Sequence, residues 1–203
     1  MNKKKKDTGY KPVAQENKIS GTNSSGTSGT SGTSGTGLQP VTAELKITRR
    51  NLPHWQQGGA TYFLTFNTKG TTLDVEDRKI VQQACLFWQD KKWHVHQLLV
   101  MPDHVHLLVT PLKRSPVENR WHSLGEIVHS VKRFSARKIN QRHSREGALW
   151  WDEYYDRLIR NEDEFAQKWE YIRMNPVKAG LASEAEEYEL YWATGFKPVP
   201  QKS

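Results

Sequence analysis

Two histidines, His104 and His106, stand at alternate positions of a β-rich run, and this spacing could support metal chemistry. Residues i and i+2 of a strand point to the same face, so the two imidazoles should lie side by side, their bases about 7 Å apart. Such a pair can hold one divalent metal ion and leave coordination positions open for phosphate oxygens. The same triplet occurs earlier at residues 94–96, and two partly exposed sheet histidines are the alternative. The tight turn before His104 favours the second triplet.

Tyr171 and Asn175 form a second pair of side chains that could take part in catalysis or metal binding. They are one helical turn apart, and hence neighbours, on a helix that begins after Asn161. At about 100° per residue, Tyr171 lies roughly 120° from Phe165, off the centre of the apolar stripe, so its hydroxyl should be exposed. A phenol beside a metal ion is a candidate nucleophile. The alternative is a helical tyrosine that packs over the sheet.

Hydrophobic periodicity predicts the elements that must position these residues. Alternating apolar residues indicate strands, and apolar residues at helical spacing indicate amphipathic helices. The Pro102-Asp103 pair predicts a turn between two strands. The apolar stripe of the last helix stops at Pro176, and Lys178-Ala179-Gly180 closes that helix. In chain order we expect strand 61–67, helix 74–90, strands 93–100 and 104–110, helix 123–141 and a helix that begins after Asn161 and is closed by residues 178–180. This order predicts an α+β fold with helices on an antiparallel sheet and disfavours a doubly wound parallel sheet.

Length and composition limit the possible organisation. The 203 residues allow one folded domain with additional segments, and residues 20–37 are almost wholly Gly, Ser and Thr. We therefore predict a disordered basic arm and linker over 1–40, a folded domain over 41–193 and a flexible tail over 194–203. The single cysteine, Cys85, has no partner for an intramolecular disulfide. The sequence shows no membrane-spanning run or signal peptide, so we expect a cytoplasmic protein without a membrane partner.

The net charge of +8 points to a polyanionic partner such as nucleic acid, although about half of the excess lies in the first 40 residues. Basic residues gather on the predicted helix 123–141 and before the first strand, and a solvated surface is the alternative to DNA binding. The candidate phosphate contacts are Lys132, Arg133, Arg137, Lys138 and Arg142 on that helix, and Arg49 and Arg50 before the strand. Aromatic residues near basic ones could stack on unpaired bases, although core packing is their commoner use; they are Trp121, Trp150, Trp151, Tyr154 and Tyr155.

Three motifs in a fixed order carry a family resemblance. They are MPDHVHLLV at 101–109, YYD at 154–156 followed by IRN at 159–161, and YIRMNPVKAGL at 171–181. Over roughly residues 45–190 the chain resembles the REP-associated tyrosine transposases, which belong to the single-tyrosine transposases with a His-hydrophobic-His motif. The resemblance implies a ferredoxin-like core of the HUH-endonuclease type. It places the histidine pair on a central strand and the tyrosine on a following helix.

The resemblance also implies an activity. Tyr171 would be the nucleophile of a metal-dependent, single-stranded DNA endonuclease and strand-transferase that forms a 5′-phosphotyrosine intermediate. His104, His106 and the amide oxygen of Asn175 would bind Mg²⁺ or Mn²⁺. The expected partner is single-stranded DNA with hairpin or palindromic repeats, and the protein would act as a monomer or a homodimer.

The chain departs from the family pattern at two positions. Arg157 stands where many relatives have a histidine, and Asp103 replaces a frequent asparagine. Arg157 and Arg160 are further candidate DNA contacts, and an ion pair with a nearby carboxylate is the alternative for Arg157. Two other functions fit the same residues: a domesticated module that binds DNA hairpins without cutting them, and a metallohydrolase of small phosphoesters. Replacing Tyr171 with phenylalanine would leave the activity of such a hydrolase nearly whole.

Overall fold

A five-stranded antiparallel sheet organises the residues that the computed structural model describes, which are 46–48 and 54–195. Its strands are β3 (Tyr62–Asn67), β4 (Trp93–Val100), β5 (His104–Pro111), β6 (Tyr155–Leu158) and β7 (Tyr191–Ala193). They lie in the order β6-β3-β5-β4-β7, and every neighbouring pair is antiparallel. The strand that begins with His104 is therefore central and paired along both edges. Strands β1 (Lys46–Thr48) and β2 (His54–Gln56) form a separate antiparallel pair.

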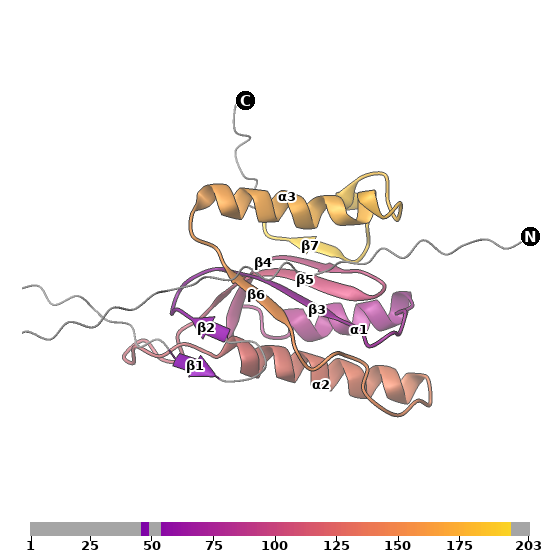
Figure 1. Cartoon of the computed structure of the whole chain (residues 1–203), viewed down its shortest axis with the longest axis horizontal. Helices are drawn as coiled ribbons and strands as arrows, with labels where there is room; N and C mark the ends of the chain where they lie inside the picture. Colours follow the sequence, from indigo (N-terminus) through magenta and orange to yellow (C-terminus); the bar gives the residue numbers. More distant parts are fainter. Residues whose placement is uncertain (1–45, 49–53, 196–203) are drawn as a thin grey trace, which may run out of the picture. The chain divides into compact units, whose positions relative to one another are not determined.

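Three α-helices pack on this sheet. They are α1 (Val75–Leu86), α2 (Leu124–Arg142) and α3 (Glu162–Lys178), and a short 3₁₀ helix, η1 (Ala185–Glu187), follows α3. Figure 1 shows α3 on one side of the sheet and α1 and α2 on the other. The run β3-α1-β4-β5-α2-β6, with strand order β6-β3-β5-β4, is the ferredoxin-like arrangement. The expected α+β fold is thus confirmed. Within the part of the chain that is described, no helix is long and apolar enough to span a membrane.

Strand alternation divides the side chains of β3 between the two faces of the sheet. Leu64 and Phe66 are buried, and the Lys132 ammonium of α2 lies 5.5 Å from the Phe66 ring. The alternate residue, Phe63, instead contacts the Tyr171 ring of α3. The face toward α1 and α2 therefore buries Leu64 and Phe66, and the face toward α3 carries the candidate catalytic and metal-binding residues.

Side-chain caps fix where the helices begin. The side chains of Asp74, Ser123 and Asn161 each accept a hydrogen bond from a backbone N–H in the first turn of the helix that follows. The predicted helix starts agree with these caps. The end of α1 differs from the expectation, because the helix stops at Leu86 and not near residue 90. Asp90 adopts a positive φ of 57°, which turns the chain from the helix into β4.

The last helix continues past Pro176, where its apolar stripe stops, and ends at Lys178, in agreement with the prediction that Lys178-Ala179-Gly180 closes it. Proline lacks an N–H, so the helix forgoes the bond to the Ile172 carbonyl, and the Ala179 N–H still donates to the Asn175 carbonyl. Strands β6 and β7 were not expected. Arg49, Arg50, residues 1–40 and residues 196–203 lie outside the described residues, so the domain boundaries and the roles of those arginines stay predictions.

Candidate functional site

His104 and His106 open β5 and point to the face of the sheet that α3 covers. Their ring centroids are 4.6 Å apart, as expected for alternate residues of one strand. His106 is buried, with 4% of its surface exposed, and it pairs across the sheet with Thr65 of β3. The His104 side chain is 23% exposed and lies nearer to solvent. One imidazole is therefore anchored in the sheet, and the other borders the surface.

Each histidine has a partner on the same ring nitrogen. Nδ1 of His104 donates to the Asp103 carboxylate at 2.6 Å, and Nδ1 of His106 is hydrogen-bonded to the Thr65 hydroxyl at 2.8 Å. When Nδ1 carries the proton in these bonds, the lone pair of each ring lies on Nε2. Burial holds the pKa of His106 well below its ordinary value, and the charges of His104 and Lys168 act in the same direction. A neutral imidazole with its lone pair on Nε2 is the form that binds a metal ion.

Tyr171 lies on α3 and contacts the histidine pair. Its ring meets the His106 ring edge-on, with centroids 5.3 Å apart, and 44% of its surface is exposed. The Tyr171 side chain is therefore not buried in the hydrophobic core. One turn further along, the Asn175 amide nitrogen donates to the Tyr171 carbonyl at 2.8 Å, so Oδ1 is the amide atom left for another partner.

An open cavity of about 520 Å³ lies between the turn before β5 and the last turns of α3. His104 and Asn175 both line it, together with Asp103 and Lys178. Neither His106 nor Tyr171 lines this cavity. The His106 ring contacts both His104, which lines the cavity, and Tyr171. The structure thus brings the four predicted site residues together at one end of the sheet, beside space open to solvent.

The earlier triplet, His94-Val95-His96, has nearly the same ring separation, 4.8 Å. Its ring nitrogens are engaged differently. His96 Nε2 is hydrogen-bonded to the Thr110 hydroxyl, and His94 Nδ1 is bonded to the Asp90 carboxylate. Burial lowers the pKa of His96 to about 4, with the charge of His94 contributing. Ring spacing does not distinguish the two triplets, whereas the contacts with Tyr171 are found only at the second, within the described part of the chain.

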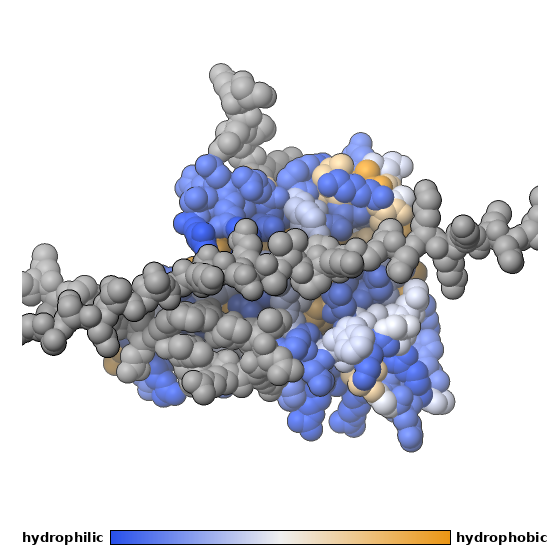
Figure 2. Space-filling model, in the orientation of Figure 1, coloured by the Kyte–Doolittle hydropathy of each residue, from blue (hydrophilic) through white to orange (hydrophobic). Residues whose placement is uncertain are grey.

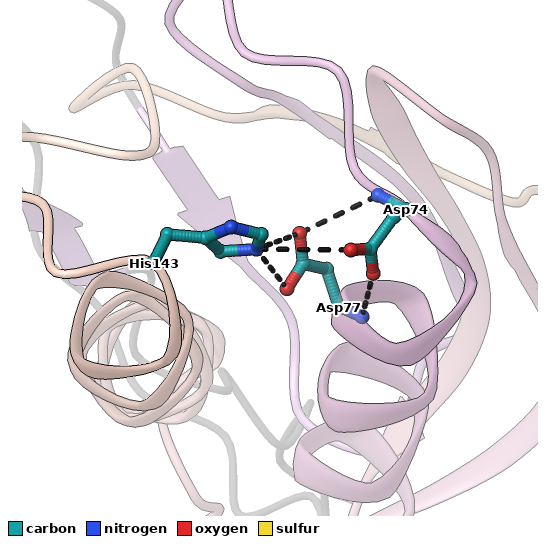
Figure 3. A group of neighbouring side chains, drawn as sticks. All are labelled: Asp74, Asp77 and His143. Atoms are coloured by element: carbon teal, nitrogen blue, oxygen red, sulfur yellow. Dashed lines mark hydrogen bonds and ion pairs between the residues drawn. The ribbon is translucent and has the colours of Figure 1, made fainter.

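A different group of potential metal ligands lies on the helices of the other face. Asp74 and Asp77, at the start of α1, and His143, after the end of α2, bring ligand atoms to within 4.8 Å of one another, a spacing that could hold a metal ion (Figure 3). The Arg142 guanidinium bonds both carboxylates, and one of its nitrogens lies 2.8 Å from His143 Nε2. This cation compensates the two carboxylates and ties the start of α1 to the end of α2.

The basic residues predicted on α2 divide into two sets. Arg133, Arg137 and Lys138 are exposed. Lys132 is only 9% exposed, and its ammonium donates to the carbonyls of residues 151, 152 and 153. The Lys132 ammonium thus holds a loop, and the Arg142 guanidinium is bonded to two carboxylates, so neither residue is among the proposed DNA contacts. On the face drawn in Figure 2, hydrophilic side chains prevail over the outer surfaces of α2 and α3.

The arginines near β6 have different surroundings. Arg157 forms an ion pair with Glu164, at 2.5 Å between Nε and the carboxylate, which is the alternative that the sequence left open. Arg160 is exposed, and its backbone N–H donates to the same carboxylate. Among the five predicted aromatic candidates, Trp150 and Tyr154 are buried, whereas Trp151 and Tyr155 are about half exposed.

Sequence reasoning missed three residues of this site. Thr65 holds His106, and Phe63 stacks on His106 with centroids 5.4 Å apart. The Lys168 ammonium lies 5.5 Å from the centroid of the Tyr171 ring. Lys168 precedes Tyr171 by three residues, so helical spacing alone could have placed it on the same side. Thr65 and Phe63 could be found only once the register between β3 and β5 was known.

Known proteins resemble this chain in sequence and in fold. A Haemophilus influenzae protein, provisionally named as a REP-associated tyrosine transposase, is 26% identical over 144 residues, which cover 64% of this chain and 77% of that protein. A solved REP-associated tyrosine transposase, bound to a REP hairpin, superposes with a TM-score of 0.58 at 16% identity. The match covers 76% of this chain and 99% of that structure. At this identity the likeness supports the fold.

The family model is more specific than either relative. The model described as "Transposase IS200 like" matches residues 64–175, from the first strand of the ferredoxin-like core to Asn175 in α3. The matched segment includes both histidines of β5 and Tyr171, and it covers more than half of the chain. The chain therefore belongs to the IS200-like transposase family.

Proposed function

We propose that this transposase is a metal-dependent, single-stranded DNA endonuclease and strand-transferase with Tyr171 as its nucleophile. The observation that carries the proposal is that two histidines of β5 and one tyrosine of α3 lie side by side. The His104 and His106 rings are 4.6 Å apart, and the His106 ring is 5.3 Å from the half-exposed Tyr171 ring. A nucleophile placed beside a metal-binding pair is the arrangement that phosphodiester cleavage needs.

The residues present fit a divalent metal ion. Nε2 of His104, Nε2 of His106 and Oδ1 of Asn175 would hold it, since their other polar atoms have partners within the protein. Three protein ligands leave open positions for phosphate oxygens, and we propose Mg²⁺ or Mn²⁺ as the ion. Such an ion, when bound, neutralises charge on the non-bridging oxygens of the phosphate under attack.

Tyr171 would carry the covalent step. Its Oη forms a bond to phosphorus while the bond from phosphorus to the 3′-oxygen of the leaving strand breaks. The phenol proton passes to solvent, and the leaving oxygen takes a proton from solvent and becomes a 3′-hydroxyl. The DNA is left attached through a 5′-phosphotyrosine, which stores the energy of the broken bond. A 3′-hydroxyl of another strand can then attack the same phosphorus, release Tyr171 and rejoin DNA.

The proposed substrate is single-stranded DNA with hairpin-forming repeats. Support comes from the similar fold that was solved with a REP hairpin bound. Arg133, Arg137 and Lys138 would contact phosphates through the exposed side of α2, and Arg160 would do so beside β6. Because α2 lies on the sheet face opposite Tyr171, its cations would contact DNA away from the phosphate that is cut.

Incubating the protein with a single-stranded hairpin oligonucleotide and Mn²⁺ tests this function. We expect cleavage by the wild type and none by Tyr171→Phe, which should still fold and bind the oligonucleotide. Tight binding without cleavage by the wild type would favour a binding module in place of a nuclease. Full activity of Tyr171→Phe would favour hydrolysis through water and would remove Tyr171 from the mechanism.

A further inference from the structure

Phe63 of β3 connects the candidate site to two residues that the proposed function does not use. It is 4% exposed, and its ring contacts the rings of His106 and Tyr171 at 5.4 and 5.8 Å between centroids. The same ring contacts Tyr155 edge-on at 6.3 Å, and the Lys168 ammonium lies 4.9 Å from its centroid. Tyr155 is therefore separated from Tyr171 and His106 by one buried ring, and Lys168 lies beside that same ring.

Tyr155 offers a fixed aromatic surface at this place. It belongs to the edge strand β6 and pairs with Thr65, so it shares the sheet face with His106. Half of its surface, 49%, is exposed even though the ring packs against Phe63. An exposed ring held in one orientation is what stacking on an unpaired base requires, and a paired base would not be free to stack there.

Lys168 offers a positive charge beside the nucleophile. No carboxylate among the described residues lies within ion-pair distance of its ammonium, which instead sits over the rings of Phe63 and Tyr171. Partial burial lowers the pKa of Lys168, the charge of Arg157 acts in the same direction, and the charge of Glu164 acts against them. A partly desolvated cation that forms no ion pair with a described carboxylate is suited to bind an incoming phosphate oxygen.

We propose that Tyr155 and Lys168 form a nucleotide subsite around Phe63, where an unpaired base stacks on Tyr155 and Lys168 binds a non-bridging oxygen of the phosphate that Tyr171 attacks. The inference rests on the proposed function and adds a physical reason for single-strand specificity. A base that stays paired in a duplex cannot reach the Tyr155 ring, so its phosphate is not aligned with Tyr171.

Binding measurements test the base-stacking half of the subsite and need no cleavage. The affinity of a hairpin oligonucleotide is measured for the wild type, Tyr155→Ala and the control Phe87→Ala, whose exposed ring lies at the end of α1. Each unpaired nucleotide is then replaced in turn by an abasic residue. We expect Tyr155→Ala to weaken binding about 5- to 100-fold, and one abasic position to abolish the difference from the wild type. An equal loss at every abasic position, or no loss, would overturn the stacking assignment.

Cleavage kinetics test the role of Lys168. We compare Lys168→Met with Lys168→Arg and with the control Lys91→Met, which removes an exposed lysine from the turn before β4. The expected result is a fall in kcat of about 10- to 100-fold for Lys168→Met with a smaller change in KM, and recovery in Lys168→Arg. Normal kcat in Lys168→Met, or an equal loss in Lys91→Met, would overturn the phosphate contact. Those results would leave the proposed function standing, provided that the wild type still forms its covalent adduct.

Discussion

Replacing Thr65 with valine removes the only protein partner of His106 Nδ1 that the described residues supply, and it nearly preserves side-chain volume. The bond is 2.8 Å long and reaches an imidazole that is 4% exposed, so water cannot readily replace the hydroxyl. Loss of a buried hydrogen bond should lower the free energy of unfolding by about 1–3 kcal/mol. Loss of the hydroxyl that orients the His106 ring should weaken metal binding by about 10- to 100-fold, or about 1.4–2.7 kcal/mol.

The assay for this variant is Mn²⁺ titration followed by calorimetry, with urea unfolding to measure stability. Thr61→Val is the matched control, because it removes a hydroxyl from the bond between Thr61, which directly precedes β3, and Thr110 of β5. The control should lose stability and keep wild-type affinity for Mn²⁺. If Thr65→Val binds Mn²⁺ as tightly as Thr61→Val, then His106 is not oriented by Thr65 as a metal ligand and the reasoning fails.

Three further predictions concern stability and DNA binding. Asp74→Ala should lower the free energy of unfolding by about 1 kcal/mol in urea denaturation, because it removes the cap of α1, whereas Asp74→Asn should retain most of that cap. Because the folded pKa of His96 is about 4 and the unfolded value is near 6.5, the unfolded chain binds a proton more readily between those pH values, so stability should fall as pH drops through this window. His96→Gln should show a flatter pH dependence in the same unfolding measurement, and an unchanged slope would contradict this. Replacing Arg133, Arg137 and Lys138 with alanine should reduce the slope of log affinity against log salt by about 2–3, and an unchanged slope would remove α2 from the DNA interface.

The sequence predicted elements well where periodicity and caps are local. The two strands around the Pro102-Asp103 turn end within one residue of the expectation, and the caps of α2 and α3 lie where they were expected. Strands β6 and β7 were missed because they have four and three residues. Such short strands owe their conformation to the partner strand that supplies their hydrogen bonds, and no local pattern reports that partner.

The candidate site shows the same division between local and long-range information. The side-by-side placement of His104 and His106 followed from strand geometry, and the exposure of Tyr171 followed from its place on the helix. The use of Lys132 could not be predicted, because its ammonium binds carbonyls of a loop about twenty residues away. A lysine can bury its stem and donate inside the fold, and helical periodicity does not reveal that outcome.

The most direct test of the central claim is to trap the covalent product and find its point of attachment. The full chain is incubated with a hairpin oligonucleotide and Mn²⁺, denatured, digested with nuclease and protease, and analysed by mass spectrometry. We predict a nucleotide joined through its 5′-phosphate to Tyr171. Attachment to another residue, Tyr155 included, or cleavage without any adduct would contradict the proposal that Tyr171 attacks the phosphodiester.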